Sequence, residues 1–194
     1  MKKAFVAVAA AALSISAPGW AADGDRVGDF NLQARGGVSG FTGALGEYTA
    51  AGPSWGVGLN VQPYRMIGFE VNYEGSRNHI TDDRFTVSPS LTRHGASAMV
   101  KLAPPFLDRI RPFAGVGLGA SYVSADDPDG LYRSDFIQEV PLAAGLEFNS
   151  GMFSAGLRAT YRFLIDENFA DAAQPVGNPE GGLFDASVMV GARF

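Results

Sequence analysis

Apolar residues recur at every second position along most of this chain. In the last segment, the even-numbered positions from Phe184 to Phe194 are apolar, whereas Asp185, Ser187 and Arg193 lie between them. Because successive side chains of a strand point to opposite faces of a sheet, this segment is predicted to be a strand with one apolar face and one polar or small-residue face.

Further segments upstream show the same alternation, and together they predict eight strands. Their apolar positions span residues 30–38, 55–61, 67–73, 96–102, 114–122, 140–148, 153–163 and 184–194. Long links rich in Gly, Asp, Asn and Pro are expected near 40–53, 76–90, 124–135 and 164–182, and shorter links at 63–66, 103–111 and 149–151. Short periplasmic turns alternating with long extracellular loops are typical of a transmembrane barrel.

The predicted fold is therefore all-β, an eight-stranded antiparallel up-and-down transmembrane barrel. A soluble barrel of the lipocalin type is the alternative, because it has the same alternation with the apolar face turned inward. Glycines on the polar face favour the membrane barrel, since the interior of eight strands is narrow and needs small residues. The terminal Phe194 and aromatic residues that could form an interfacial girdle also favour it. These aromatic residues are Trp55, Tyr73, Tyr122, Phe136, Tyr161, Phe163 and Phe184.

The N-terminus has the pattern of a secretory signal peptide. Lys2 and Lys3 precede an apolar run from residue 4 to 13, and small residues follow as far as Ala21. An uncleaved anchor is the alternative, but the run is shorter than the roughly 20 residues that span a bilayer as a helix. We expect residues 1–21 to be a signal peptide and residues 22–194 to be the barrel domain.

Composition excludes several kinds of chemistry. The formal net charge of −5 gives no support for a nucleic-acid partner. Cysteine is absent, so disulfides, thiolate nucleophiles and thiolate metal sites are excluded. No glycine-rich loop with the pattern of a phosphate-binding turn is found, and no cofactor is expected.

Two stretches resemble a known family. Residues 111–119 (RPFAGVGLG) and the ending 188–194 (VMVGARF) are similar to the small eight-stranded outer-membrane β-barrels typified by OmpX and the transmembrane domain of OmpA. The resemblance covers the chain beyond the signal peptide and implies the outer membrane of a Gram-negative bacterium. It also implies contact with outer-membrane lipids, biogenesis by the barrel assembly machinery and periplasmic chaperones with Phe194 as an assembly signal, and a monomeric state.

The predicted inward faces carry acids and bases in equal number. Unpaired charges would be costly in a narrow lumen, so a structural network of ion pairs is expected, with a gated ion path as the alternative. The residues of this predicted network are Asp29, Glu70, Glu74, Glu139, Glu147 and Asp185 with Arg35, Arg93, Lys101, Arg158, Arg162 and Arg193. On the opposite, outward face, Leu146 is expected to contact lipid near mid-strand.

Only two histidines could act as imidazole catalysts or ligands. His79 is expected in the second long loop beside Asp82 and Asp83, where a metal site is not predicted. His94 is expected to face outward near the extracellular end, where outer-membrane lipid A deacylases and palmitoyltransferases place a His and a Ser. No acidic residue has the matching parity, and so no catalytic residue is assigned.

The sequence therefore predicts a non-enzymatic outer-membrane protein that stabilises the envelope or presents its loops to the outside. A small pore or transporter of small hydrophobic molecules is one alternative. A lipid A-modifying enzyme is the other.

Overall fold

The computed structural model describes residues 29–47, 49–81, 90–104, 109–126, 135–165 and 181–194. The predicted signal peptide lies outside these residues, and so do Asp82 and Asp83. Within the described part of the chain, no helix is long and apolar enough to cross a membrane.

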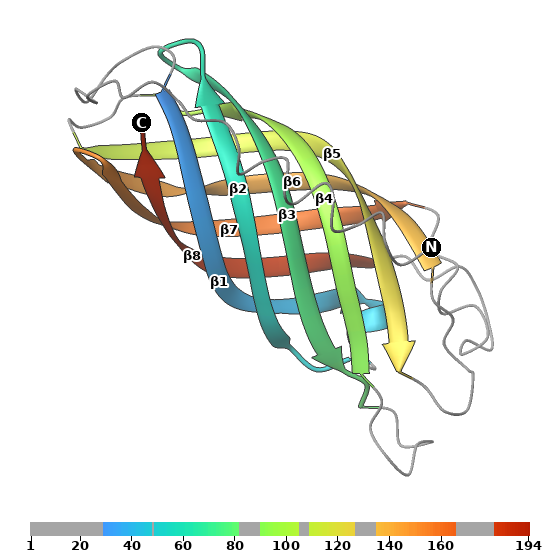
Figure 1. Cartoon of the computed structure of the whole chain (residues 1–194). Coiled ribbons are helices and arrows are strands. Elements are labelled where there is room, and N and C mark those ends of the chain that lie inside the picture. Colours follow the sequence, from blue (N-terminus) through green and yellow to red (C-terminus); the bar gives the residue numbers. More distant parts are fainter. Residues whose placement is uncertain (1–28, 48, 82–89, 105–108, 127–134, 166–180) are drawn as a thin grey trace, which may run out of the picture.

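Eight antiparallel strands form a closed barrel in which each strand pairs with its neighbours in sequence and β1 also pairs with β8 (Figure 1). The strands are β1 (Asp29–Gly43), β2 (Gly52–Gln62), β3 (Ile67–His79), β4 (Ser90–Leu102), β5 (Ile110–Asp126), β6 (Asp135–Ser150), β7 (Phe153–Ile165) and β8 (Gly181–Arg193). A short 3-10 helix, η1 (Ala44–Glu47), follows β1. The predicted fold class is confirmed.

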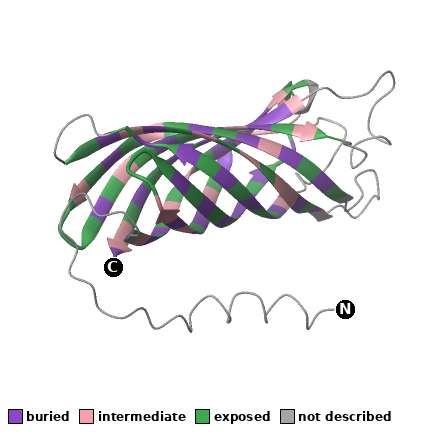
Figure 2. Cartoon of the chain, turned by 90° about the horizontal axis from the view of Figure 1, so that it is seen from above, coloured by how far each residue is buried: buried purple, intermediate pink, exposed green. Residues whose placement is uncertain are grey.

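The apolar face of each strand is outside the barrel. Figure 2 shows buried and exposed residues alternating along the strands. Leu118 is 73% exposed and Leu157 is 61% exposed, whereas Glu70 and Glu139 are 2% exposed. A lipocalin-like barrel would have the opposite distribution, because its apolar face must avoid water. This wall is suited to lipid, and the soluble alternative is excluded.

Small residues inside the barrel leave space for larger side chains from other strands. A Cβ atom at Gly145 of β6 would lie 2.7 Å from the ring of Phe113 on β5. Phe113 belongs to an apolar cluster that crosses the lumen with Met99, Ala143 and Met189. The glycine in β6 therefore permits an aromatic ring to fill the interior, as the narrow lumen of an eight-stranded barrel requires.

The sequence pattern predicted an inward face of polar and small residues, but part of the interior is lined by large apolar side chains. Inward-facing apolar side chains are buried near the ends of the strands that precede or follow the long links. These side chains are Phe41, Ile80, Leu91, Val123, Ile137 and Leu183. Apolar side chains at this end of the lumen are buried without needing the partners that polar groups would require there.

Two predicted positions need correction. β3 continues to His79, so this residue ends a strand and does not belong to the following loop. Leu146 faces outward as expected, but it lies close to the end of β6 and not near its middle. Leu142 is nearer to the centre of that strand. Alternation reports which face a residue occupies, but it does not report where a strand ends.

Candidate functional site

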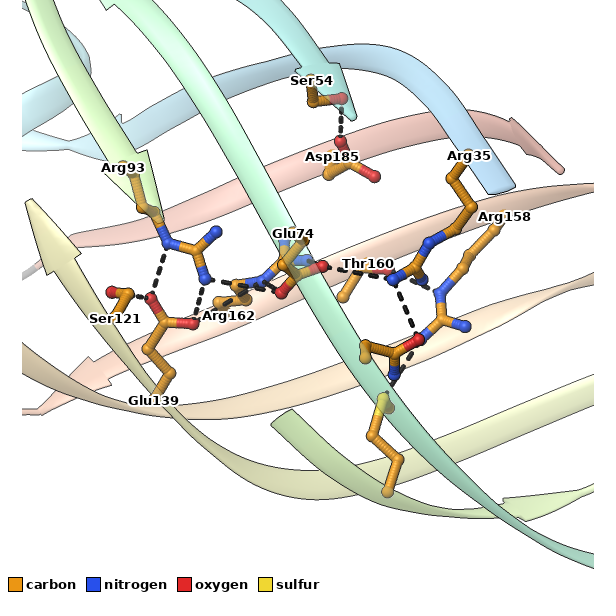
Figure 3. Close-up of polar contacts among 12 residues, drawn as sticks. Arg35, Ser54, Glu74, Arg93, Ser121, Glu139, Arg158, Thr160, Arg162 and Asp185 are labelled. Carbon is orange, nitrogen blue, oxygen red and sulfur yellow. Dashed lines mark hydrogen bonds and ion pairs between the residues drawn. The ribbon is translucent and has the colours of Figure 1, made fainter. Parts of the chain in front are cut away.

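The side chains of the two groups of ion pairs described below come from five strands. The inward positions of β3 and β6 carry the glutamates, and those of β1, β4 and β7 carry the basic residues. Figure 3 shows several of them converging inside the barrel, namely Arg35, Glu74, Arg93, Glu139, Arg158 and Arg162. Acids and bases therefore face one another across the lumen and not only along neighbouring strands.

Glu74 and Glu139 organise the first group of ion pairs. Arg162 donates from Nε to Oε1 of Glu74 at 2.9 Å and from Nη2 to Oε2 at 2.5 Å. Arg93 donates from Nε to Oε1 of Glu139 at 2.8 Å, and its Nη2 bonds the second oxygen. Arg93 also reaches Glu74 at 3.4 Å, and Arg35 reaches the same carboxylate at 3.5 Å. Nε of Arg162 also lies 3.7 Å from Oε2 of Glu139. Each glutamate is thus close to more than one guanidinium, and two of these pairs are bidentate.

Glu70 and Glu147 organise the second group. Arg158 donates from Nη1 to Oε1 of Glu70. The ammonium group of Lys101 lies 2.5 Å from Oε1 of Glu147 and 3.9 Å from Oε2 of Glu70. The same ammonium group is 4.7 Å from the centre of the Phe113 ring, which favours a cation. Lys101 therefore joins the two carboxylates and rests on the apolar cluster.

Asn72 connects the two groups. Its Oδ1 accepts from Nη2 of Arg35 at 2.9 Å, and its Nδ2 donates to Oε1 of Glu70 at 2.8 Å. The charged side chains consequently form one continuous network across the lumen. A connected network of this kind rigidifies a polar interior, whereas removing one member weakens the pairing of a buried charge. Oε2 of Glu70 accepts no hydrogen bond among the described residues, and the ammonium group of Lys101 lies 3.9 Å from it.

The remaining predicted network residues are Asp185, Arg193 and Asp29. Asp185 of β8 accepts from the hydroxyl of Ser54. Arg193 is buried at the end of β8. The side chain of Asp29 lies outside the described part of the chain.

Arg111 is a buried lumen residue that the sequence interpretation did not include. It donates from Nη1 to Oε1 of Gln62 at 3.2 Å and from Nη2 to the carbonyl of Arg65 at 3.3 Å. Its parity with Phe113 places it on the inward face and could have identified it.

Three serine hydroxyls next to the first group have no hydrogen-bond partner among the described residues. Ser39, Ser76 and Ser187 are all buried, and they line a small pocket with Asp185 and Arg35. Buried hydroxyl groups of this kind are normally satisfied by ordered water. The pocket is chemically suited to water and adjoins the ion pairs.

The histidines lie on the outer wall and not in the lumen. His94 faces outward, its Nδ1 is 3.1 Å from the hydroxyl of Tyr73, and its ring stacks on that of Tyr73 with centroids 6.2 Å apart. The ring of Trp55 meets His94 edge-on at 6.1 Å. Among the described residues, no group of three or more His, Cys, Asp or Glu is placed to hold a metal ion.

Comparison with known proteins identifies a family. The family described as outer membrane protein beta-barrel domain matches residues 6–194. No curated protein matches the chain.

Solved structures share the fold at low sequence identity. Neisserial surface protein A is 17% identical with a TM-score of 0.59, over 86% of this chain and 99% of that chain. Ail, the attachment invasion locus protein of Yersinia pestis, is 12% identical with a TM-score of 0.59, over 87% of this chain and 100% of that chain. OprG of Pseudomonas aeruginosa is 10% identical with a TM-score of 0.57, over 88% of this chain and 98% of that chain. These likenesses concern the fold alone.

Proposed function

The chain belongs to the outer membrane protein beta-barrel domain family, and from this premise we propose that it is a non-enzymatic envelope protein whose lumen is closed by ion pairs. It is an outer-membrane protein in contact with the lipids of that membrane. The proposed role is to stabilise the envelope or to present the long links between strands to the outside.

The observation that carries this proposal is the continuous charged network across the lumen. Glu70 and Glu74 are held from several strands, and the side chains of their partners Arg158 and Arg162 are 2% and 4% exposed. A wide aqueous channel would hydrate such groups, and they would be exposed. The closed interior supports a structural role over transport through the lumen.

The positions of the links support a role in presentation. Residues 44–51, 80–89, 127–134 and 166–180 connect strands at one end of the barrel, whereas 63–66, 103–109 and 151–152 connect them at the other. In outer-membrane barrels the longer links are extracellular and the shorter turns are periplasmic. We therefore place the first set outside the cell, where a soluble or cellular partner could reach it.

The proposal assigns no catalytic residue. His94 faces outward from β4, and its described contacts are with the rings of Tyr73 and Trp55. A hydrolase would need a nucleophile and an acidic partner within hydrogen-bond reach of the imidazole. The rings hold His94 in place, but they supply neither group.

A deletion strain tests the proposal against both alternatives. Mass spectrometry of lipid A should give the same species with and without the gene, and uptake of small hydrophobic compounds should be unchanged. Sensitivity to detergent or loss of surface binding should be the phenotype. A lipid A species that disappears on deletion and returns with the wild-type gene, but not with His94→Ala, would replace this proposal with an enzyme.

A further inference from the structure

The lipid-facing wall of the barrel carries a single formal charge among the described side chains of its strands. From β1 to β8 the outward positions are apolar, aromatic, small or uncharged polar, with one exception at Arg77 of β3. Arg77 is exposed. A charged side chain on the lipid face is costly at the middle of a bilayer and far less so near its surface. The position of Arg77 along the barrel axis therefore decides whether it contacts acyl chains or lipid head groups.

Arg77 lies near the end of β3 that the long links adjoin, and Ile67 begins the strand at the opposite end. At about 3.3 Å per residue, the distance between them along the strand is about 33 Å. With a strand tilt of about 40°, this corresponds to roughly 25 Å along the barrel axis, which is the height of the apolar band of such barrels. Arg77 is thus at the level of the outer lipid head groups.

Hydrogen-bonding side chains and aromatic rings lie close to Arg77 on the outer wall. Its Nη2 donates to the hydroxyl of Ser90 at 3.2 Å, and this contact occupies one of the five guanidinium N–H groups. The exposed His79 lies on the same face of β3, and its backbone pairs with Ser90. Nearer the middle of the strand, Gly75 pairs with both Trp55 and His94, and a Cβ atom at Gly75 would be 2.7 Å from the ring of Trp55. The ring of His94 packs on those of Trp55 and Tyr73 there.

We propose that Arg77 and His79 form a binding site for the phosphorylated head group of a lipid in the outer leaflet. A guanidinium binds phosphate with two parallel hydrogen bonds, and the imidazole of His79, on the same face of β3, adds a donor beside it. The rings of Trp55 and Tyr73 lie one level deeper, where the first carbons of acyl chains would pack on them.

A lipid fits this position better than a soluble partner. The side chains face sideways from the barrel wall, in the plane of the membrane, and not upward with the long links. The outward positions of β2 and β4 around them carry no acid. At the end of β5, Asp126 has outward parity and its backbone pairs with Ser90, and its side chain lies outside the described part of the chain. The buried glutamates of β3 and β6 point into the lumen, as Glu74 does beside Gly75.

The test measures lipid binding by the purified, folded barrel. The probes are lipid A with both phosphates, the same lipid with one phosphate, and the fully dephosphorylated lipid, each titrated into the detergent-solubilised protein and followed by native mass spectrometry. The variants are Arg77→Gln, Arg77→Lys and, as a matched control, Arg65→Gln, which removes an exposed arginine from the turn between β2 and β3. Gel mobility before and after boiling verifies that each variant is folded.

Wild type and Arg65→Gln should prefer the phosphorylated lipid, and Arg77→Gln should bind it about tenfold more weakly, since one charge-assisted contact is lost. Arg77→Lys should bind with intermediate affinity, because lysine keeps the charge without the bidentate geometry. Equal affinity of wild type and Arg77→Gln for the phosphorylated lipid would overturn the site. An equal loss of affinity in Arg77→Gln and Arg65→Gln would overturn it as well.

The mass of the recovered lipid separates this inference from the proposed function. Binding alone leaves the lipid unchanged, as both proposals require. A lipid that is bound through Arg77 and also loses an acyl chain would support the site but contradict the non-enzymatic function.

Discussion

The buried carboxylates of the lumen each depend on several cations. Glu74 contacts Arg35, Arg93 and Arg162, and Glu70 contacts Arg158 and Lys101. Taking a charge out of water is expensive, so these contacts compensate a desolvation cost and do not simply add stability. Removing one partner should therefore lower the free energy of unfolding, because the other charge stays buried with less compensation.

Arg158→Ala should lower the free energy of unfolding by about 3–5 kcal/mol, because the buried carboxylate of Glu70 loses its guanidinium partner and keeps only the more distant ammonium group of Lys101, at 3.9 Å. Unfolding in urea, followed by gel mobility or tryptophan fluorescence, measures the change. A double-mutant cycle with Glu70→Ala is the control, and the double variant should be less destabilised than the sum of the singles. Additive effects would mean that the two groups do not interact as the structure places them.

Depth on the outer wall should set the cost of a charge facing lipid. Leu142→Arg, near the centre of β6, should cost about 2–4 kcal/mol, and Leu146→Arg, nearer the strand end, should cost less. Ala143→Ser, which faces the lumen, is the control and should cost least. The same unfolding measurement in lipid vesicles ranks the three variants. A larger cost for Leu146→Arg than for Leu142→Arg would place the membrane centre elsewhere on the barrel.

At the scale of the strand, closure depends on one pairing between the ends of the sheet. β1 and β8 pair along most of their length, and beyond β8 the backbones of Phe30 and Phe194 exchange two hydrogen bonds, at 3.1 and 3.0 Å. An open edge in lipid would leave backbone groups unsatisfied, so this seam is required for a spanning barrel. The terminal residue therefore contributes to the seam as well as to any recognition during assembly.

Deleting Phe194 should reduce the amount of folded protein in the outer membrane. The resemblance to related barrels implies that this aromatic end is recognised by the assembly machinery. Phe194→Ala separates the two contributions, because it keeps the backbone pair with Phe30 while removing the ring. Quantitative blotting of outer-membrane fractions measures both variants. Wild-type levels of the alanine variant would show that the ring carries no signal.

Strand number and the face of each residue could be predicted from sequence, because a period of two follows directly from strand geometry. The partners inside the lumen could not. Glu74 meets Arg162 from β7, which is on the far side of the barrel, and such contacts depend on the stagger of the strands. The apolar end of the lumen, with Leu91 and Ile137, was also missed, since parity says nothing about depth.

At the scale of the whole molecule, an apolar wall encloses a charged interior. This distribution is unstable in water and suited to a bilayer, in agreement with the family to which the chain belongs. The closed sheet leaves no free edge, which makes such barrels resistant to detergent at room temperature. The molecule should therefore remain folded in sodium dodecyl sulfate until it is heated.

Unheated protein should consequently migrate faster on a detergent gel than boiled protein, because the folded barrel is compact. The shift should be present in outer-membrane fractions and absent from the soluble periplasm. A single mobility before and after boiling, together with recovery in the soluble fraction, would contradict the membrane barrel.

Conductance of the purified barrel in planar bilayers tests the closed lumen most directly. The wild type should give at most rare and small current steps, because the charges from Glu147 and Lys101 to Glu139 and Arg93 are paired across the interior. Arg158→Ala should lower stability without giving a steady current, since the other pairs remain. Large, steady currents from the wild type would contradict the account, and a steady current from a stable Arg158→Ala barrel would show that the network is a gate.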